Sequence, residues 1–335
     1  MKKTSPPNTY RAAFNDYTEP HIYMITLTTE YRKPILGQLF HDENNPHIIL
    51  TPLGMFVNDE LDKIKTIYPQ IKIIARQVMP DHIHFIIYVS ERIPVHLSKI
   101  ISGYKAGCNG AYLEYIATTS ERSETQQGKK FDAGMRLLTQ SKPTQKIQLF
   151  SAKYHDRILS GKNQLQHMID YIHDNPRRLM LKYLHRDYFK VRKININGIT
   201  VSVIGNIKLL DSKDKIQVRC SRKNNNDEIN KLTKYFIDKA SKGVVLVSPF
   251  ISPGEKAIEK IALENHYCLI KIVNNGFPPL YKPSGIYFDL CSESKLLLVS
   301  SFEYKSTKTN LTKKQCEEMN LLALYICQQN YLQQQ

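Results

Sequence analysis

Two histidines separated by one residue are the feature of this sequence that most directly suggests chemistry. They lie in the segment Met79-Pro80-Asp81-His82-Ile83-His84-Phe85-Ile86-Ile87, whose apolar, β-branched run predicts a strand. Because strand side chains alternate between faces, His82 and His84 project from one face and Ile83 from the other. Neighbouring imidazoles on a rigid surface form a natural pair of ligands for one divalent metal ion. An isolated pair can equally be two histidines that only form hydrogen bonds.

A later segment supplies a phenol and an amide. Between residues 165 and 176, apolar residues at helical spacing predict a helix that faces a core, and Tyr171 and Asn175 share a face at the edge of that stripe. Two imidazoles, an amide oxygen and a tyrosine suffice to cut a phosphodiester. Mg²⁺ or Mn²⁺ would polarise the phosphate, and Tyr171 would be the nucleophile. The alternative for Tyr171 is a packing residue whose hydroxyl reaches solvent.

The composition indicates a folded protein with a polyanionic partner. The chain has 335 residues, 41% of them hydrophobic, and a formal net charge of +16. An excess of positive charge in a folded chain points to nucleic acid. The six cysteines form no Cys-x-x-Cys pair, which indicates a reducing compartment. No signal peptide or membrane-length apolar segment is recognisable, so we expect a soluble, cytoplasmic protein without a membrane partner.

Length and pattern predict two domains, at residues 1–195 and 200–335. In the first, strands are expected at 21–29, 47–51, 71–78 and 82–89, and helices at 52–68, 94–116 and 163–175. Residues 118–146 are rich in Ser, Thr, Gln, Lys and Gly and predict a flexible loop. In the second, strands at 215–220, 244–248, 268–273 and 296–300 alternate with helices at 227–240, 255–264 and 313–327. That alternation predicts an α/β domain with a parallel sheet.

Several blocks resemble one known family. Residues 79–87 resemble the His-hydrophobic-His block of the HUH superfamily, specifically the single-strand tyrosine transposases, with the REP-associated branch closest. Asp81 stands where that branch usually has Asn. The segment Tyr171–Leu181 resembles the block that carries the nucleophile, and Lys153–Leu159 resembles an intervening Tyr-His-Asp-Arg segment. Ile25–Leu36 resembles the opening strand and basic turn. The blocks follow the family's order over roughly residues 15 to 190.

The resemblance implies a fold, an activity and roles for four residues. The fold would be α+β, a ferredoxin-like antiparallel sheet with helices on one face. His82, His84 and Asn175 would be metal ligands and Tyr171 the nucleophile. The activity would be that of a transposase, a metal-dependent single-stranded DNA endonuclease and strand transferase. It would cleave next to a hairpin through a covalent 5′-phosphotyrosine, as a monomer or homodimer.

Two other functions remain open at this point. One is a non-catalytic, domesticated relative that binds hairpin DNA. The other is a relaxase-like plasmid nickase, against which the compact spacing of the blocks argues. Basic residues near the blocks are candidates for contacts with DNA phosphates, and a solvated charged surface is the alternative for each. These candidates are Lys99, Lys105, Arg157, Arg177, Arg178, Lys182 and Arg186. His155, Asp156 and Arg157 could also serve the site directly, but bracing the site or contacting DNA is favoured for them.

The second half of the chain resembles the Rossmann-like domain of the DNA-processing protein A (Smf) family. The resemblance covers residues 205–223, 243–263 and 268–281. Most of that family's glycines, which let backbone amides approach a phosphate, are absent. Arg219-Cys220-Ser221-Arg222 replaces a Gly-Ser-Arg turn, and Ser248-Pro249-Phe250 replaces a glycine-rich one. We therefore expect an accessory module for single-strand binding or oligomerisation, without nucleotide chemistry. A fold kept only for packing is the alternative.

Overall fold

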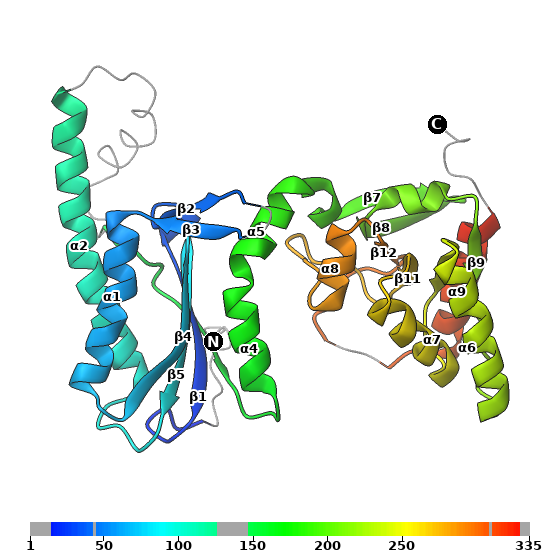
Figure 1. The fold of residues 1–335 in the computed structure, drawn as a ribbon, viewed down its shortest axis with the longest axis horizontal. Coiled ribbons are helices and arrows are strands. Elements are labelled where there is room, and N and C mark those ends of the chain that lie inside the picture. The colour runs from blue at the N-terminus through cyan, green and yellow to red at the C-terminus, as the bar shows by residue number, and fades with distance from the viewer. Residues whose placement is uncertain (1–14, 43–44, 126–146, 308–309, 329–335) are drawn as a thin grey trace, which may run out of the picture. The chain divides into compact units, whose positions relative to one another are not determined.

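The computed structural model describes residues 15–42, 45–125, 147–307 and 310–328. It divides into two compact units, one on each side of the junction between residues 180 and 181 (Figure 1). The first is α+β with an antiparallel sheet, and the second is α/β with a mostly parallel sheet. The expected fold classes are thus confirmed.

The first unit is built on a four-stranded antiparallel sheet with the order β4-β5-β1-β6. Among the described elements, α1 and α2 connect these strands in the order β-α-β-β-α-β, which is the connectivity of the ferredoxin-like fold. A two-stranded hairpin of β2 and β3 precedes the first helix. The elements are β1 (Ile22–Thr28), β2 (Gly37–Phe40), β3 (His47–Leu50), α1 (Pro52–Ile67), β4 (Ile71–Met79), β5 (His82–Val89), α2 (Leu97–Thr125) and β6 (His155–Ile158).

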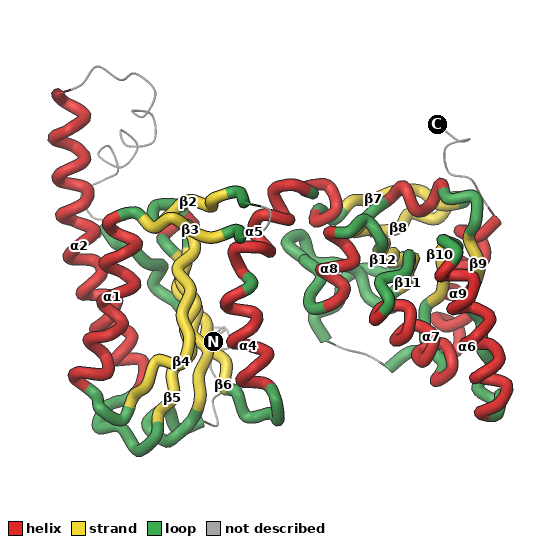
Figure 2. Tube along the Cα trace, in the orientation of Figure 1, coloured by secondary structure: helices red, strands yellow, loops and turns green. Residues whose placement is uncertain are grey.

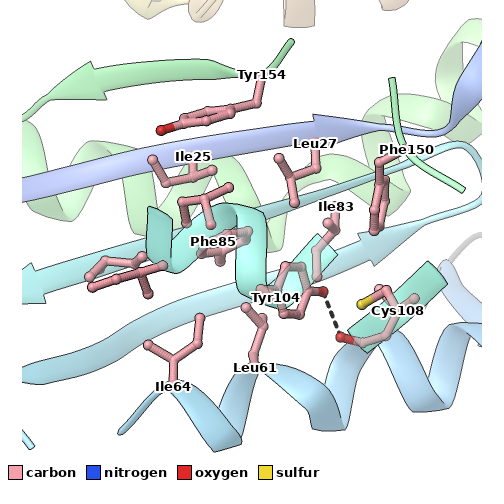
Figure 3. Close-up of a cluster of buried hydrophobic side chains, with 14 of the residues drawn as sticks. Ile25, Leu27, Leu61, Ile64, Ile83, Phe85, Tyr104, Cys108, Phe150 and Tyr154 are labelled. Atoms are coloured by element: carbon pink, nitrogen blue, oxygen red, sulfur yellow. Dashed lines mark hydrogen bonds between the residues drawn. The ribbon is translucent and has the colours of Figure 1, made fainter. Parts of the chain in front are cut away.

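One face of this sheet is buried under α1 and α2. Ile83 and Phe85 of β5 pack with Leu61 of α1 and Tyr104 of α2 in the main core (Figure 3). The Tyr104 hydroxyl, also buried, donates a hydrogen bond to the carbonyl oxygen of Val57 at 2.7 Å. This core requires alternate residues of β5 to face the two helices.

The opposite face carries a further helix, α4 (Gln164–His173). Ile172 of α4 packs against Met24 of β1 and Ile86 of β5 in a separate, smaller apolar cluster. The expectation of helices on one face holds for α1 and α2, whereas α4 lies across the sheet from them (Figures 1 and 2). The reason is that Met24 and Ile86 alternate with the main-core residues and need an apolar cover of their own.

The helix α2 is longer than its sequence pattern indicated. It was expected to end at residue 116, before a loop from 118, but it continues to Thr125. Residues 117–125 are polar but contain neither Gly nor Pro, so nothing in their backbone stops the helix. The rest of the expected loop, residues 126–146, lies outside the described residues.

The second unit has a six-stranded mixed sheet with the order β7-β8-β12-β11-β10-β9. Strands β9 to β12 are parallel to one another, as expected, and β8 joins β12 in antiparallel orientation. Helices cover both faces, in two apolar clusters. The elements are β7 (Arg192–Ile196), β8 (Ile199–Gly205), β9 (Lys215–Gln217), α6 (Asn226–Ser241), β10 (Val245–Ser248), α7 (Pro253–Glu264), β11 (Leu269–Ile272), α8 (Ile286–Ser292), β12 (Leu296–Ser300) and α9 (Lys313–Gln328).

The division between the units lies earlier than the expected boundary near residue 195. It falls within α5 (Asn175–Leu184), and β7 pairs with β8 in the second sheet. Asn197 and Gly198 join these strands, with φ angles of 49° and 79°. Two consecutive residues of positive φ form the tight turn of a β-hairpin. The turn at Asn197 and Gly198 therefore lies in a hairpin inside the second unit.

Among the described helices, none has both the length and the apolar character that crossing a bilayer requires.

Replacing two glycines with alanine is expected to change stability in opposite directions. Gly103 lies in α2, where an added methyl group meets no atom within 4 Å. G103A should raise the free energy of unfolding by about 0.5–1 kcal/mol, because alanine loses less backbone entropy on folding. G198A should lower it by about 1 kcal/mol or more, because its φ of 79° strains any residue with a Cβ. Chemical denaturation measures both changes, and a stabilising G198A would contradict the hairpin geometry.

Candidate functional site

The two histidines lie side by side on the face of the sheet that carries α4. Their ring centroids are 4.7 Å apart and the rings are nearly perpendicular. The residues that pair with them on β1 are Thr28 and Thr26, whose side chains share that face. His84 is 8% exposed, and the His82 side chain is 17% exposed. The pair is therefore partly sheltered and held by neighbouring strands on both sides.

Each imidazole has a defined partner at Nδ1. Nδ1 of His82 is 2.5 Å from Oδ1 of Asp81, and Nδ1 of His84 is 2.8 Å from the hydroxyl oxygen of Thr26. A cation would consequently be bound through Nε2 of each ring. Metal-binding histidines commonly use their second nitrogen in this way, to contact a carboxylate or another polar group.

Tyr171 projects from α4 next to this pair. Its ring centroid is 6.0 Å from that of His84, and the residue is 37% exposed. The next residue, Ile172, is completely buried in the cluster beneath α4, which places Tyr171 at the edge of the helix contact. The guanidinium carbon of Arg178 lies 5.5 Å from the centre of the phenol ring. The structure thus brings Tyr171, His84 and Arg178 together at a partly exposed edge.

Asn175, the predicted third ligand, lies at the junction of α4 and α5. Pro176 has no N–H to donate to the carbonyl oxygen of Ile172, four residues earlier. Nδ2 of Asn175 donates to that oxygen instead, at 3.3 Å. The residue is 7% exposed. The amide therefore stabilises the interrupted helix, and its role as a ligand stays a prediction.

The predicted DNA-contact residues do not form one cluster. Arg157 of β6 pairs with Met24 of β1, so its side chain lies on the histidine face. Arg177 forms two hydrogen bonds with the carboxylate of Asp174, at 2.5 and 3.0 Å. Beyond the division between the units, Lys182 lies in α5, and Arg186 stacks over the Tyr183 ring at 5.6 Å.

Lys99 and Lys105 lie on α2 and are separated from the histidine pair by the sheet. Nζ of Lys105 donates to the carbonyl oxygens of Ser151 and Ala152, at 2.6 and 3.1 Å. Burial lowers the pKa of Lys105 below its ordinary value. Its ammonium group therefore ties a loop of the first unit to α2.

His155 and Asp156 occupy opposite faces of β6. His155 pairs with Thr26 and shares the face of His84, two strands away. Asp156 points toward the main core and accepts a 2.6 Å hydrogen bond from the Tyr17 hydroxyl. Asp156 thus braces the main core on the face opposite the histidines, whereas a role at the site or on DNA was expected.

Two residues that hold the histidines, one of them through Asp81, were not predicted from the sequence. Thr26 contacts His84, and the guanidinium of Arg32 contacts Oδ2 of Asp81 at 3.2 Å. Burial alone would raise the pKa of Asp81, but the hydrogen bond from His82 and the charge of Arg32 outweigh burial and lower it. The alternation of Ile25, Thr26, Leu27 and Thr28 was the available signal, because threonines at every second position of a buried strand indicate a polar face. Arg32 had no such signal.

Within the described part of the chain, no group of three or more His, Cys, Asp or Glu side chains could hold a metal ion. Among these residue types, the candidate ligands are therefore the two imidazoles. A bound metal ion would need oxygen atoms at its remaining coordination positions.

The second unit has a pocket of about 580 Å³ near the carboxyl ends of β9 and β10. Arg219, Arg222 and Lys313 give it a positive lining, and Glu255 of α7 lies within it. The Glu255 carboxylate accepts hydrogen bonds from the backbone N–H groups of Cys220, Ile251 and Ser252, at 2.8–3.2 Å. The amides that could bind a phosphate are therefore already used by a carboxylate of the chain itself.

Comparison with known proteins finds distant likenesses. No family model matches the chain. An uncharacterized protein of Haemophilus influenzae (strain ATCC 51907 / DSM 11121 / KW20 / Rd) is 24% identical over 166 residues, which are 48% of this chain and 83% of that protein.

Solved structures similar to parts of the chain include two DNA-related proteins. One is a REP-associated tyrosine transposase bound to a REP hairpin, 14% identical with a TM-score of 0.31, over 53% of this chain and 84% of that one. The other is DNA processing protein A from Helicobacter pylori, whose single-stranded DNA binding has been described. It is 16% identical with a TM-score of 0.31, over 42% and 67%. Likenesses this weak carry no argument about activity.

Removing the Glu255 carboxylate is expected to destabilise the second unit. E255A leaves three backbone N–H groups without their acceptor and should lower the free energy of unfolding by about 1–3 kcal/mol. E264A is the matched control, because Glu264 is an exposed residue of the same helix with a 3.9 Å ion pair to Lys260. That change should stay within about 0.5 kcal/mol. Equal effects in urea denaturation would contradict the role assigned to Glu255.

Proposed function

We propose that this chain is a metal-dependent single-stranded DNA endonuclease and strand transferase, a HUH-type tyrosine transposase that cleaves next to hairpin DNA. The observation that carries the proposal is the 6.0 Å separation between the rings of Tyr171 and His84, with His82 beside them on the same face. Segments about 90 residues apart in the sequence supply a nucleophile and two metal-binding groups at one partly exposed edge. The net charge of +16 favours a polyanionic substrate.

His82 and His84 would hold Mg²⁺ or Mn²⁺ through Nε2, with Asn175, water or DNA phosphate supplying oxygen ligands. The partners at Nδ1, Asp81 and Thr26, fit this use, because they orient each ring by its other nitrogen. When bound, the cation supplies positive charge against the scissile phosphate.

Tyr171 would act as the nucleophile toward that phosphate. Its oxygen forms a bond to phosphorus while the bond from phosphorus to the 3′ oxygen of the preceding nucleotide breaks. The phenol proton passes to solvent, and the departing 3′ oxygen takes up a proton to become a hydroxyl. The product is a 5′-phosphotyrosine. Attack by a second 3′-hydroxyl reverses these changes, joins the strands and restores Tyr171.

Side chains around Tyr171 would position the DNA strand. Arg178 lies over the phenol ring, and Arg157 lies on the same face of the sheet. Both can contact the phosphates on either side of the scissile bond. Tyr171 and His84 are in contact range within one chain, which supports cleavage by the tyrosine of the same chain in a monomer or a homodimer.

Covalent capture tests the role of Tyr171. Incubation with a single-stranded DNA hairpin and Mn²⁺ should give a protein–DNA adduct that survives denaturation. Y171F should abolish the adduct, since it removes the attacking oxygen. Y183F is the matched control, because Tyr183 is also exposed and also has an arginine over its ring, Arg186 at 5.6 Å. Denaturing gel electrophoresis with labelled DNA measures the adduct.

If the protein binds hairpins but forms no adduct with any of several sequences flanking the hairpin, the proposed endonuclease activity is contradicted. That result would favour the non-catalytic hairpin-binding protein instead. An adduct that persists in Y171F but disappears in Y183F would show that the nucleophile is Tyr183 of α5 and not Tyr171 of α4.

Removal of the metal should abolish cleavage in a way that depends on the histidines. EDTA is expected to eliminate the adduct and added Mn²⁺ to restore it in the unaltered protein. In H82A and H84A, Mn²⁺ should fail to restore it, because one ligand is missing. H167A, a change at a histidine on α4 that is not part of the site, controls for the loss of an imidazole. Adduct formation that is indifferent to EDTA would contradict the metal requirement.

A further inference from the structure

We propose that Asp81 and Arg32 are positioning residues that fix the imidazole of His82 with its hydrogen on Nδ1 and its lone pair on Nε2. The inference rests on the proposed function, because it assigns His82 to a cation. It adds two residues to the site and a defined tautomer to one of its ligands.

Asp81 is in direct contact with His82. Their atoms Oδ1 and Nδ1 are 2.5 Å apart, the separation of a strong, charge-assisted hydrogen bond. A carboxylate can only accept, so Nδ1 of His82 is the donor. In a neutral imidazole the other nitrogen then carries the lone pair. The hydroxyl of Thr26 imposes no such choice on His84, because it can donate or accept.

Asp81 is itself held in place by contacts with Arg32 and Thr29. The guanidinium of Arg32 binds its second carboxylate oxygen at 3.2 Å. The backbone N–H of Thr29 donates to the Asp81 carbonyl oxygen at 2.9 Å, and the Thr29 hydroxyl shares its one hydrogen between that oxygen and the carbonyl oxygen of Lys33, at 3.0 and 2.9 Å. Thr29 is completely buried. The turn that presents the carboxylate to His82 is thus fixed from the loop after β1.

The loop after β1, which contains Arg32, has an unusual backbone conformation. Tyr31 and Arg32 have φ angles of 56° and 52°, so two consecutive residues with a Cβ adopt the left-handed region. Such residues are strained, and strain of this kind gathers at functional sites. Here the strained pair carries the guanidinium that reaches Asp81.

Substitutions at Asp81 separate positioning from simple support of the turn. D81A removes the acceptor, whereas D81N keeps an oxygen that can accept from Nδ1. Loss of a group that orients a metal-binding histidine typically weakens metal binding by about 10- to 100-fold. We expect D81A to lose Mn²⁺ affinity to that extent, D81N to recover most of it, and R32A to show a smaller loss than D81A.

Two measurements read out these variants without DNA cleavage. Electron paramagnetic resonance of Mn²⁺ gives the affinity, and long-range ¹H–¹⁵N correlation spectra of the metal-free protein give the tautomer of His82. D62A is the matched control, because Asp62 also binds an arginine, Arg76 at 3.0 Å, and does so away from the histidines. It should leave both signals unchanged. If D81A does not fold, R32A serves as the test, because it removes the guanidinium that holds Asp81, and an unchanged Mn²⁺ affinity in R32A would overturn the inference.

A D81A variant that folds, binds Mn²⁺ as the unaltered protein does and keeps its tautomer would overturn the inference. So would an unaltered protein whose His82 carries its hydrogen on Nε2. The proposed function fails separately, by the absence of a Tyr171 adduct in the unaltered protein. An adduct together with an indifferent D81A would reject the positioning role alone.

Discussion

The register of β5 between its two neighbours is the constraint on which the site depends. Ile83, Phe85 and Ile87 are completely buried against α1 and α2, so β5 cannot slip by one residue without exposing all three. The intervening positions must then face the other way, and these are His82 and His84. The core therefore determines which surface of the sheet can do chemistry, although no core residue takes part in it.

The same constraint explains why a helix brings Tyr171 to the histidines. The face opposite the main core still contains Met24 and Ile86, which need an apolar cover. Ile172 of α4 supplies it, and the neighbouring Tyr171 is left at the edge. The cluster that holds α4 is smaller than the main core. Elements held by fewer buried contacts open at lower free energy, so we expect α4 to open more easily than α1 and α2.

Much of the fold could be predicted because its signals are local. The alternation in β5, the helical spacing in α1 and the apolar runs of β10 and β12 each depend on a few neighbouring residues. Features that depend on distant partners could not be predicted in the same way. Asn197 and Gly198 are a local signal for a hairpin, but nothing local indicates that this hairpin belongs to the second sheet. Nor does anything local indicate that Arg32 reaches Asp81, almost fifty residues away.

The same distinction between local signals and distant partners applies to the residues of the site. Period-two spacing identified the two histidines, and helical spacing identified Tyr171 as a surface residue of its helix. Spacing could not place Lys99 and Lys105, because only the packing of α2 decides which face of the sheet they lie on. Nor could it reveal that Asn175 replaces the hydrogen bond that Pro176 cannot make.

The central claim is that both imidazoles and the phenol converge on one cation. Anomalous diffraction from crystals grown with Mn²⁺ and a hairpin oligonucleotide tests it most directly. The account predicts one strong anomalous peak within bonding distance of Nε2 of His82 and of His84, with the Tyr171 oxygen facing a phosphate bound to the same ion. A peak elsewhere in the chain, or a Tyr171 oxygen turned away from the ion in every copy, would contradict it.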